Sequence, residues 1–262
     1  MKNLLRNVAR TTVEQLAGTR ILRDEEKVLV RDAQIYWQDS YSKNHRSNSH
    51  WCGDTGIDDT IWRELGKRHL DLFRNYLALK SLNRPTHRIV EWGCGGGANA
   101  IHFATEGEEF VGVDVSSNSL TECGRRLQDM GFFNYLPIQI TVDNPDKAVE
   151  HLIGTCDVFL CTYVFELFPT PEYGQRIVNL AYRLLRPSGF AIIQIKYGTH
   201  ERRTRPRRWS YERNLANMTT YTIEDFWLIA EQAGFSPFSV TLRPKDELVG
   251  DERYAYFLLE KK

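Results

Sequence analysis

The sequence has 262 residues, 42% of them hydrophobic, and its 34 basic side chains balance its 34 acidic ones. This length favours one large domain with an extension over two independent domains, and the balanced charge excludes a general electrostatic attraction to nucleic acid or membranes. No apolar run approaches the roughly 18 residues of a membrane span, and the first residues lack the apolar centre of a secretion signal. We therefore expect a cytoplasmic protein without a membrane segment.

The five cysteines lie far apart in the sequence and form no Cys-x-x-Cys pair. Because metal sites and redox-active pairs generally use close spacing, we predict buried free thiols and no metal. The cysteines are Cys52, Cys94, Cys123, Cys156 and Cys161.

Residues 1–84 are predicted to form an N-terminal helical cap or lid, because they lack the alternating apolar and polar pattern of strands. Residues 42–56 are polar and are interpreted as a loop. From Ile57 onward, apolar residues recur on one helical face. This helix should pack on the core and end before a linker at residues 83–85.

Residues 85–262 are predicted to form the core, in which strands and helices alternate as in an α/β domain. The strand at residues 156–161 is almost entirely apolar, which indicates burial on both faces in a mostly parallel sheet with helices on either side. Seven strands are expected, at residues 88–91, 109–114, 135–142, 156–161, 191–195, 235–242 and 254–259.

The strongest chemical signal is a glycine-rich turn at residues 93–97, between the first strand and a helix expected at residues 97–105. Glycines allow positive φ angles and a close approach of the backbone to a ligand. The helix N-terminus should present unpaired N–H groups, so we expect the turn to hold an anionic or carbonyl-rich group.

Asp114 ends the second strand, about 20 residues after the first glycine of the turn. A carboxylate at this position can accept hydrogen bonds from both hydroxyls of a ribose. The serines that follow would also suit a simple helix N-cap, which is the structural alternative for Asp114.

The Glu-x-Gly-x-Gly-x-Gly order at residues 91–97 resembles motif I of the class I S-adenosylmethionine-dependent methyltransferases. In that family the acidic residue neutralises the ammonium of the methionine moiety. Residues 162–169 resemble motif IV, and residues 184–190 resemble the Leu-Lys-Pro-Gly-Gly turn before the fifth strand. The same glycines with Ala98 also satisfy the dinucleotide-binding fingerprint, so an NAD-dependent oxidoreductase stays as an alternative.

This resemblance covers residues 85–262 and implies a Rossmann-like α/β fold, a seven-stranded mostly parallel sheet with an antiparallel last strand, and S-adenosyl-L-methionine as cofactor. Residues 35–41 resemble the aromatic segment that folds over the cofactor in many small-molecule methyltransferases, although these rings would also pack a cap onto a core. Asp143 matches an acidic residue that commonly meets the adenine amino group. The implied cofactor-binding residues are Tyr36, Trp37, Tyr41, Glu91, Gly93, Cys94, Gly95, Asp114, Val115, Asp143, Asn144, Cys161 and Thr162.

A basic segment at residues 198–211 carries five arginines within seven positions. Its proline and its charge density predict a loop at the carboxyl edge of the sheet, where substrates bind in open α/β folds. Guanidinium groups beside aromatic rings suit an anionic ligand, whereas the plainer interpretation is a solvated surface loop. The residues predicted to bind the acceptor are Tyr163, Arg207, Arg208 and Trp209.

These features predict a methyltransferase that methylates an oxygen, or with less support a nitrogen, of a polar small molecule that is saccharide-like or anionic. The candidate bases are His200, preferred because it follows the fifth strand, then Glu166 and His50. One alternative is methylation of nucleic-acid bases such as those of RNA, which the lack of an Asn-Pro-Pro-Tyr-like motif after the fourth strand disfavours. Another is a methyltransferase-like protein that only binds the cofactor or a partner. The sequence predicts no oligomeric state.

Overall fold

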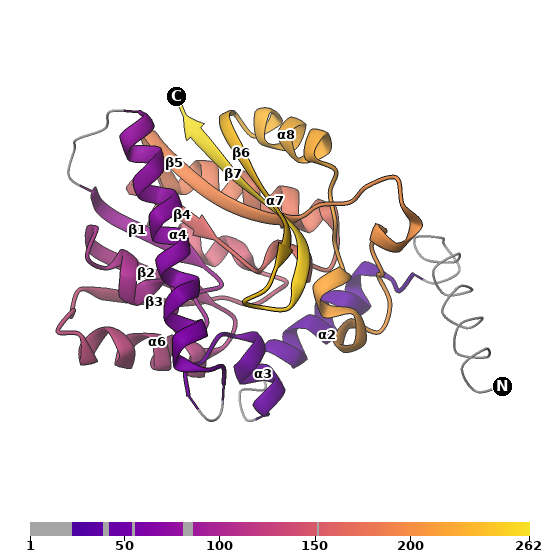
Figure 1. Cartoon of the computed structure of the whole chain (residues 1–262), viewed down its shortest axis with the longest axis horizontal. Helices are drawn as coiled ribbons and strands as arrows, with labels where there is room; N and C mark the ends of the chain where they lie inside the picture. The colour runs from indigo at the N-terminus through magenta and orange to yellow at the C-terminus, as the bar shows by residue number, and fades with distance from the viewer. Residues whose placement is uncertain (1–22, 39–41, 54–55, 81–85, 151) are drawn as a thin grey trace.

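The computed structural model describes residues 23–38, 42–53, 56–80, 86–150 and 152–262 and has one seven-stranded sheet at its centre (Figure 1). The strands are β1 (Thr86–Trp92), β2 (Gly107–Asp114), β3 (Tyr135–Gln139), β4 (Cys156–Cys161), β5 (Leu185–Lys196), β6 (Phe235–Asp246) and β7 (Asp251–Lys261). Their order is β3-β2-β1-β4-β5-β7-β6. Strands β1 to β5 pair in parallel, and β7 is antiparallel to both β5 and β6. The predicted seven-stranded, mostly parallel α/β fold with an antiparallel last strand is confirmed.

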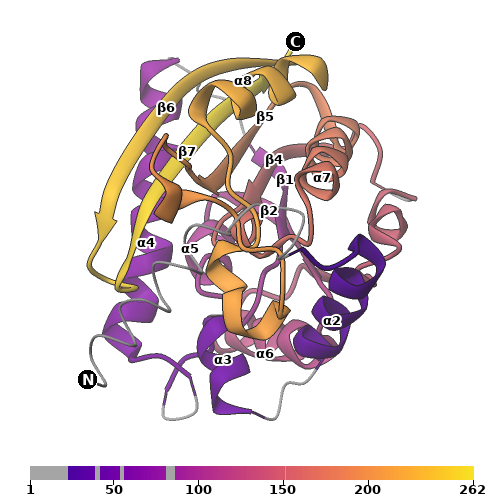
Figure 2. The ribbon, with the colours of Figure 1, turned by 90° about the vertical axis from the view of Figure 1, so that its right-hand side faces the viewer.

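Helices cover both faces of the sheet (Figures 1 and 2). The helices on one face are α4 (Asp59–Leu79), α5 (Ala100–Phe103) and α6 (Ser117–Asp129), and those on the other are α7 (Pro171–Leu184) and α8 (Ile223–Gln232). Neighbouring strand residues point to opposite faces, so Ile89 of β1 belongs to the core under α4 and Val90 to the core under α7.

Two helices of the N-terminal segment, α2 (Glu26–Gln38) and α3 (Lys43–Asn48), lie near each other below the sheet in Figure 1. Short 3₁₀ helices stand in several connections: η2 (Pro145–Val149), η3 (Phe165–Leu167), η4 (Arg202–Thr204) and η5 (Tyr211–Asn217). Of these, η5 packs against α2. Segments distant in sequence therefore meet beside the sheet.

Several local predictions were wrong. Residues 42–56 are not only a loop, because they contain the six-residue helix α3, whose N-cap Ser42 accepts from the His45 amide at 3.0 Å. So short a helix has too few residues to show an apolar periodicity. The helix expected at residues 97–105 is only α5, four residues long. Strand β3 ends at Gln139 rather than at residue 142.

Helix α4 belongs to the helical layer of the core, although it lies in the segment predicted to be a cap. The Phe73 ring of α4 lies 5.5 Å from the Phe103 ring of α5 and 5.6 Å from the Phe190 ring of β5. The boundary predicted at residue 84 lies outside the described residues, so the division into a cap at residues 1–84 and a core at residues 85–262 stays a prediction.

The five cysteines are all buried and free, as predicted. In the described part of the chain, no helix is both long and apolar enough to cross a bilayer. Within those same residues, His, Cys, Asp and Glu side chains form no group of three that could hold a metal ion.

Candidate active site

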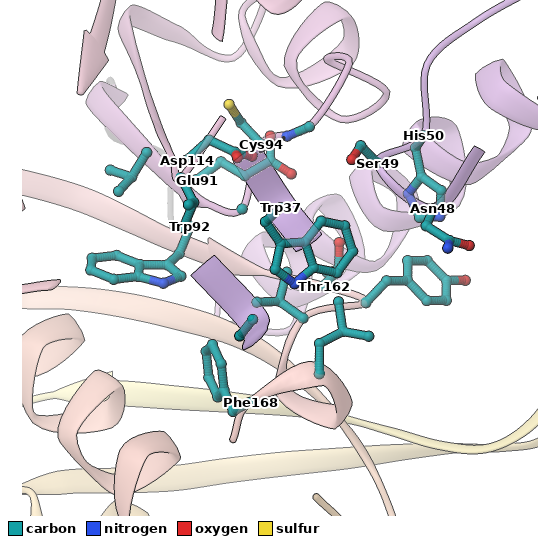
Figure 3. A pocket seen from close by; sticks show the side chains of 18 of the residues that line it. Trp37, Asn48, Ser49, His50, Glu91, Trp92, Cys94, Asp114, Thr162 and Phe168 are labelled. Carbon is teal, nitrogen blue, oxygen red and sulfur yellow. Dashed lines mark hydrogen bonds between the residues drawn. The ribbon is translucent and has the colours of Figure 1, made fainter. Parts of the chain in front are cut away.

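A cavity opens at the carboxyl ends of the parallel strands, where ligands bind in open α/β sheets. Glu91 comes from the end of β1, Asp114 from the end of β2, and Thr162 follows β4. Trp37 of α2 and His50, just after α3, line the cavity as well. In Figure 3, Glu91 and Asp114 lie on one side of Trp37 and His50 on the other. The N-terminal segment thus completes a site that the sheet begins.

Glu91 has one carboxylate oxygen engaged and one free. Its Oε1 accepts from Asn99 Nδ2 at 2.6 Å, whereas Oε2 is buried without a hydrogen-bond partner. Burial raises the pKa of Glu91 to about 8. A buried carboxyl oxygen without a partner is costly, so this cavity suits a ligand that brings a cation or a hydrogen-bond donor.

Asp114 is held by two backbone amides. Its Oδ2 accepts from Gly95 N and its Oδ1 from Ser116 N, both at 2.9 Å. Burial raises the pKa of Asp114, and these amide hydrogen bonds oppose the rise. Each oxygen keeps a second lone pair, so the carboxylate can still accept from ligand hydroxyls.

The glycine turn differs from the prediction. The amides of residues 93–97 all donate within the protein, to Val113, Val113, Asp114, Ser49 and Cys94 in that order. Gly95 has φ +49°, and an added Cβ would lie 2.2 Å from the Ser49 carbonyl oxygen. The turn therefore accommodates the segment after α3 and its own amides are engaged within the protein, while the expectation that a ligand is held at this turn and the following helix N-terminus stays a prediction.

Asn99 and His69 form a buried network that the sequence reasoning missed. Asn99 Nδ2 donates to Glu91 Oε1 and, at 3.0 Å, to Thr162 Oγ1. An amide oxygen only accepts, so His69 Nδ1 donates to Asn99 Oδ1 at 2.7 Å. Burial lowers the pKa of His69 to about 4, so at neutral pH its Nε2 accepts from the Tyr256 hydroxyl at 3.3 Å. No local sequence pattern connects these residues.

Trp37 is fixed across the cavity by the segment after η4. Its Nε1 donates to the Tyr211 hydroxyl at 2.8 Å, and that hydroxyl donates to the Leu167 carbonyl at 2.7 Å. Tyr36 stays outside the cavity, where its ring meets the Trp37 ring edge-on at 4.9 Å. Tyr41 lies outside the described residues.

A second cavity shares Trp37, Asn48, His50, Tyr163 and Leu167 with the first. Glu166 of η3 lines this second cavity, is only 2% exposed, and has an Oε2 atom without a hydrogen-bond partner. Burial raises the pKa of Glu166 to about 7, and Lys196 opposes the rise.

His50 lies where the two cavities meet. Burial lowers the pKa of its imidazole to about 4, and its ring meets the Tyr163 ring edge-on at 5.1 Å. The imidazole is therefore neutral at physiological pH and a weak proton acceptor.

The structure brings many of the predicted residues together around the first cavity: Trp37, His50, Glu91, Gly93, Cys94, Gly95, Asp114, Val115, Thr162 and Tyr163. Others line neither of the two cavities: Tyr36, Asp143, Asn144, Cys161, His200, Arg207, Arg208 and Trp209. Asp143 is exposed and borders a separate hollow beside α2. His200 is exposed because the chain after β5 turns away, with Gly198 N donating to Tyr221 O at 2.7 Å.

The aromatic part of the first cavity was also missed. Phe168, Tyr173 and Tyr211 line it, together with Ile140 and Val142 after β3. Phe168 lies in the segment recognised as motif IV, so part of this signal was present in the sequence. Tyr211 was visible only as a neighbour of the arginines.

A family model described as a methyltransferase domain matches residues 62–240. The chain belongs to this methyltransferase domain family. Together with the sheet order, this match identifies a class I S-adenosylmethionine-dependent methyltransferase, whose family uses S-adenosyl-L-methionine as methyl donor. The predicted family, enzyme class and cofactor are thereby confirmed, and the oxidoreductase alternative is excluded.

The chain is 29% identical over 127 residues to an mRNA cap guanine-N(7) methyltransferase of Eremothecium gossypii, covering 44% of this chain and 29% of that one. It is 26% identical over 111 residues to a ubiquinone biosynthesis O-methyltransferase of Psychrobacter cryohalolentis, covering 40% and 39%. The chain thus spans well under half the length of these relatives.

Solved structures share the fold. Magnesium protoporphyrin IX methyltransferase of Synechocystis with bound S-adenosylhomocysteine superposes with a TM-score of 0.60 at 16% identity, over 90% of this chain and 100% of that one. A phosphoethanolamine N-methyltransferase of Haemonchus contortus gives a TM-score of 0.57 at 14% identity, over 87% and 60%. Identities this low establish the fold and leave the acceptor open.

Proposed function

We propose that this methyltransferase transfers the methyl group of S-adenosylmethionine to a hydroxyl oxygen of a small molecule bound in the second cavity. The observation that carries the proposal is that the two cavities meet at His50, Tyr163 and Leu167, and that each has a buried carboxylate oxygen without a partner. One such oxygen suits the donor, and the other suits an acceptor that must lose a proton.

The first cavity fits the donor. Glu91 Oε2 offers a partner for the methionine ammonium, and the spare lone pairs of Asp114 offer acceptors for the ribose hydroxyls. The apolar and aromatic wall after β3 and β4 suits a purine ring. This assignment gives Asp143 no role at the adenine.

Glu166 is our candidate for the base. The bound sulfonium supplies an already activated methyl group, so the protein has to align the acceptor and take up one proton. A pKa of about 7 lets Glu166 Oε2 accept the hydroxyl proton near neutral pH as the acceptor oxygen bonds to the methyl carbon and the carbon–sulfur bond breaks to leave S-adenosylhomocysteine. His50 is too weak a base, and His200 does not line either cavity.

Replacing Glu166 with Gln tests this role. We expect kcat to fall by a factor of about 10² to 10⁴ while the affinity for S-adenosylhomocysteine stays unchanged. In the unmodified enzyme, kcat should rise about tenfold per pH unit below a pKa of about 7 and level off above it. The measurement is transfer of labelled methyl to a panel of hydroxylated small molecules.

His200→Ala is the matched control, and we expect it to lower kcat by less than about tenfold. If His200→Ala gave the larger loss and Glu166→Gln left kcat intact, the base assignment would be wrong.

A second candidate function, methylation of RNA, is suggested by the likeness to an mRNA cap methyltransferase. The balanced charge of the chain and the acidic second cavity speak against it, because RNA binding relies on phosphate contacts. Labelling of total RNA, together with an RNA affinity that falls steeply with salt, would support this candidate over the small-molecule one.

A further inference from the structure

We infer that the second cavity binds an amphipathic acceptor, an apolar or aromatic body with a neutral or cationic hydrogen-bond donor, and that it rejects acceptors carrying a negative charge. This inference rests on the proposed methyl transfer and adds the acceptor's chemical class.

The lining of the second cavity is acidic. Its charged lining residues are Glu166 and Asp251, and the described residues that line it include no lysine or arginine. Lys196, the cation that lowers the pKa of Glu166, is 2% exposed and bound by Asp251 at 2.6 and 2.7 Å. A carboxylate or phosphate on the acceptor would therefore meet Glu166 without a compensating cation, and like charges at short range repel strongly in a buried site.

Most polar groups on the walls of the second cavity already have hydrogen-bond partners. The Tyr254 hydroxyl donates to Asp251 at 2.7 Å, and the Tyr163 hydroxyl donates to Asp246 at 2.9 Å. Ser47 Oγ donates to a backbone carbonyl at 3.0 Å. Glu166 Oε2 is thus an anchor without a partner in a wall whose hydroxyl groups are all paired.

The remaining surface of the second cavity is apolar and aromatic. Apolar side chains come from the start of α4 and the residues just before it, from η5 and from the β6–β7 turn, and aromatic rings come from α2, β7 and the segment after β4. They are Ile57, Ile61, Leu215, Leu248, Val249, Trp37, Tyr163 and Tyr254. A saccharide needs many polar partners, whereas these walls favour an apolar or aromatic body with one donor group.

The arginine-rich segment supports the same conclusion. The Arg208 carbonyl accepts from Asp24 N at 2.8 Å, and Asp24 Oδ2 accepts from Ser210 N at 2.9 Å. Arg207 and Arg208 line neither cavity, so they provide no cation for the anionic acceptor that the sequence suggested.

Three phenols that differ in one group provide the test: tyrosol with a neutral tail, tyramine with an ammonium, and 4-hydroxyphenylacetate with a carboxylate. Their binding is measured by calorimetry with the enzyme saturated by S-adenosylhomocysteine. We expect tyrosol and tyramine to bind at least about tenfold tighter than the carboxylate, and Glu166→Gln to reduce this ratio to within about threefold. Equal or tighter binding of the carboxylate, a ratio that survives Glu166→Gln, or binding of none of the three would overturn the inference.

A gain-of-function variant keeps the test informative if Glu166→Gln fails to fold. Val249→Arg places a cation at the cavity and should tighten carboxylate binding by about threefold to tenfold. Leu242→Arg is the matched control, because Leu242 is exposed on β6 and does not line the cavity. If both variants changed carboxylate binding equally, the cavity would not be the acceptor site. If the unmodified enzyme did not bind S-adenosylhomocysteine, the proposed function itself would be refuted.

Discussion

Three carboxyl groups, those of the buried Glu91 and Glu166 and of the half-buried Asp114, divide the chemistry of the site between them. Asp114 has both oxygens held by backbone amides, whereas Glu91 and Glu166 each keep one oxygen without a partner. Burial raises the pKa of Glu91 to about 8 and that of Glu166 to about 7. The Asp114 carboxylate is therefore held in place without a ligand, whereas each of the two glutamates has one oxygen that can still bind a hydrogen-bond donor or a cation.

Asp114→Ala should weaken S-adenosylhomocysteine binding by about 1.5–3 kcal/mol, a Kd increase of roughly 10- to 150-fold, because charged hydrogen bonds to the ribose are lost. Part of the loss would come from freeing Gly95 N and Ser116 N. Asp114→Asn controls for this, since its amide oxygen still accepts one of those bonds. Calorimetric affinities that do not respond to Asp114→Ala would remove the ribose assignment.

Glu91 should couple cofactor binding to pH. The pKa of Glu91 is about 8, so below that pH Glu91 is protonated in the free protein. Pairing with an ammonium requires the ionised form, so binding releases a proton. We expect the affinity for S-adenosylhomocysteine to rise with pH up to about 8 and Glu91→Gln to flatten this dependence. Calorimetry in two buffers with different ionisation enthalpies measures the proton release, and identical heats in both buffers would contradict it.

Connections between elements hold the site in place. Helix α4 supplies His69, the segment before α5 supplies Asn99, and strand β7 supplies Tyr256 to one network ending at Glu91. The turn at Gly95 leaves no room for a side chain, because the Ser49 carbonyl lies where a Cβ would be. A substitution at Gly95 would therefore displace the segment after α3 rather than collide only with the cofactor.

His69 is a positioning residue that acts on Glu91 through Asn99. His69→Ala removes the donor to Asn99 Oδ1 and should raise the Kd for S-adenosylhomocysteine about 5- to 30-fold. Asn99→Ala should also move the pH profile of binding upward, because the Asn99 hydrogen bond lowers the pKa of Glu91. His69→Gln can donate again and should recover part of the affinity. A pH profile identical in all variants would mean that the network acts only on stability.

Across the protein, the arginine-rich segment and η5 join the N-terminal segment to the residues that follow β4. Tyr211 is the centre of this junction, since its hydroxyl accepts from Trp37 and donates to the Leu167 carbonyl. The segment contributes Tyr211 to the lining of the first cavity and backbone atoms to the contacts with Asp24, and its arginines line neither cavity.

Tyr211→Phe leaves a buried donor and a buried acceptor without partners and should lower the free energy of unfolding by about 1–3 kcal/mol. It should also weaken S-adenosylhomocysteine binding, because Trp37 is no longer held across the cavity. Arg207→Ala is the control and should change neither quantity. Urea denaturation and calorimetry measure both effects, and a larger effect from Arg207→Ala would return the segment to ligand recognition.

Local patterns in the sequence were sufficient to predict the fold class and the strands at the sheet's centre, and to place Glu91, Asp114 and the glycine turn beside the cavity. Alternating apolar residues report burial, and a polar residue at the end of a parallel strand lies at the ligand edge in any fold of this class. The roles of His69, Asn99, Tyr211 and Glu166, and the displacement of His200 from the site, depended on packing between segments up to 187 residues apart, as for His69 and Tyr256. Whether a carboxylate oxygen finds a partner is decided by such distant contacts, and no local period or spacing encodes them.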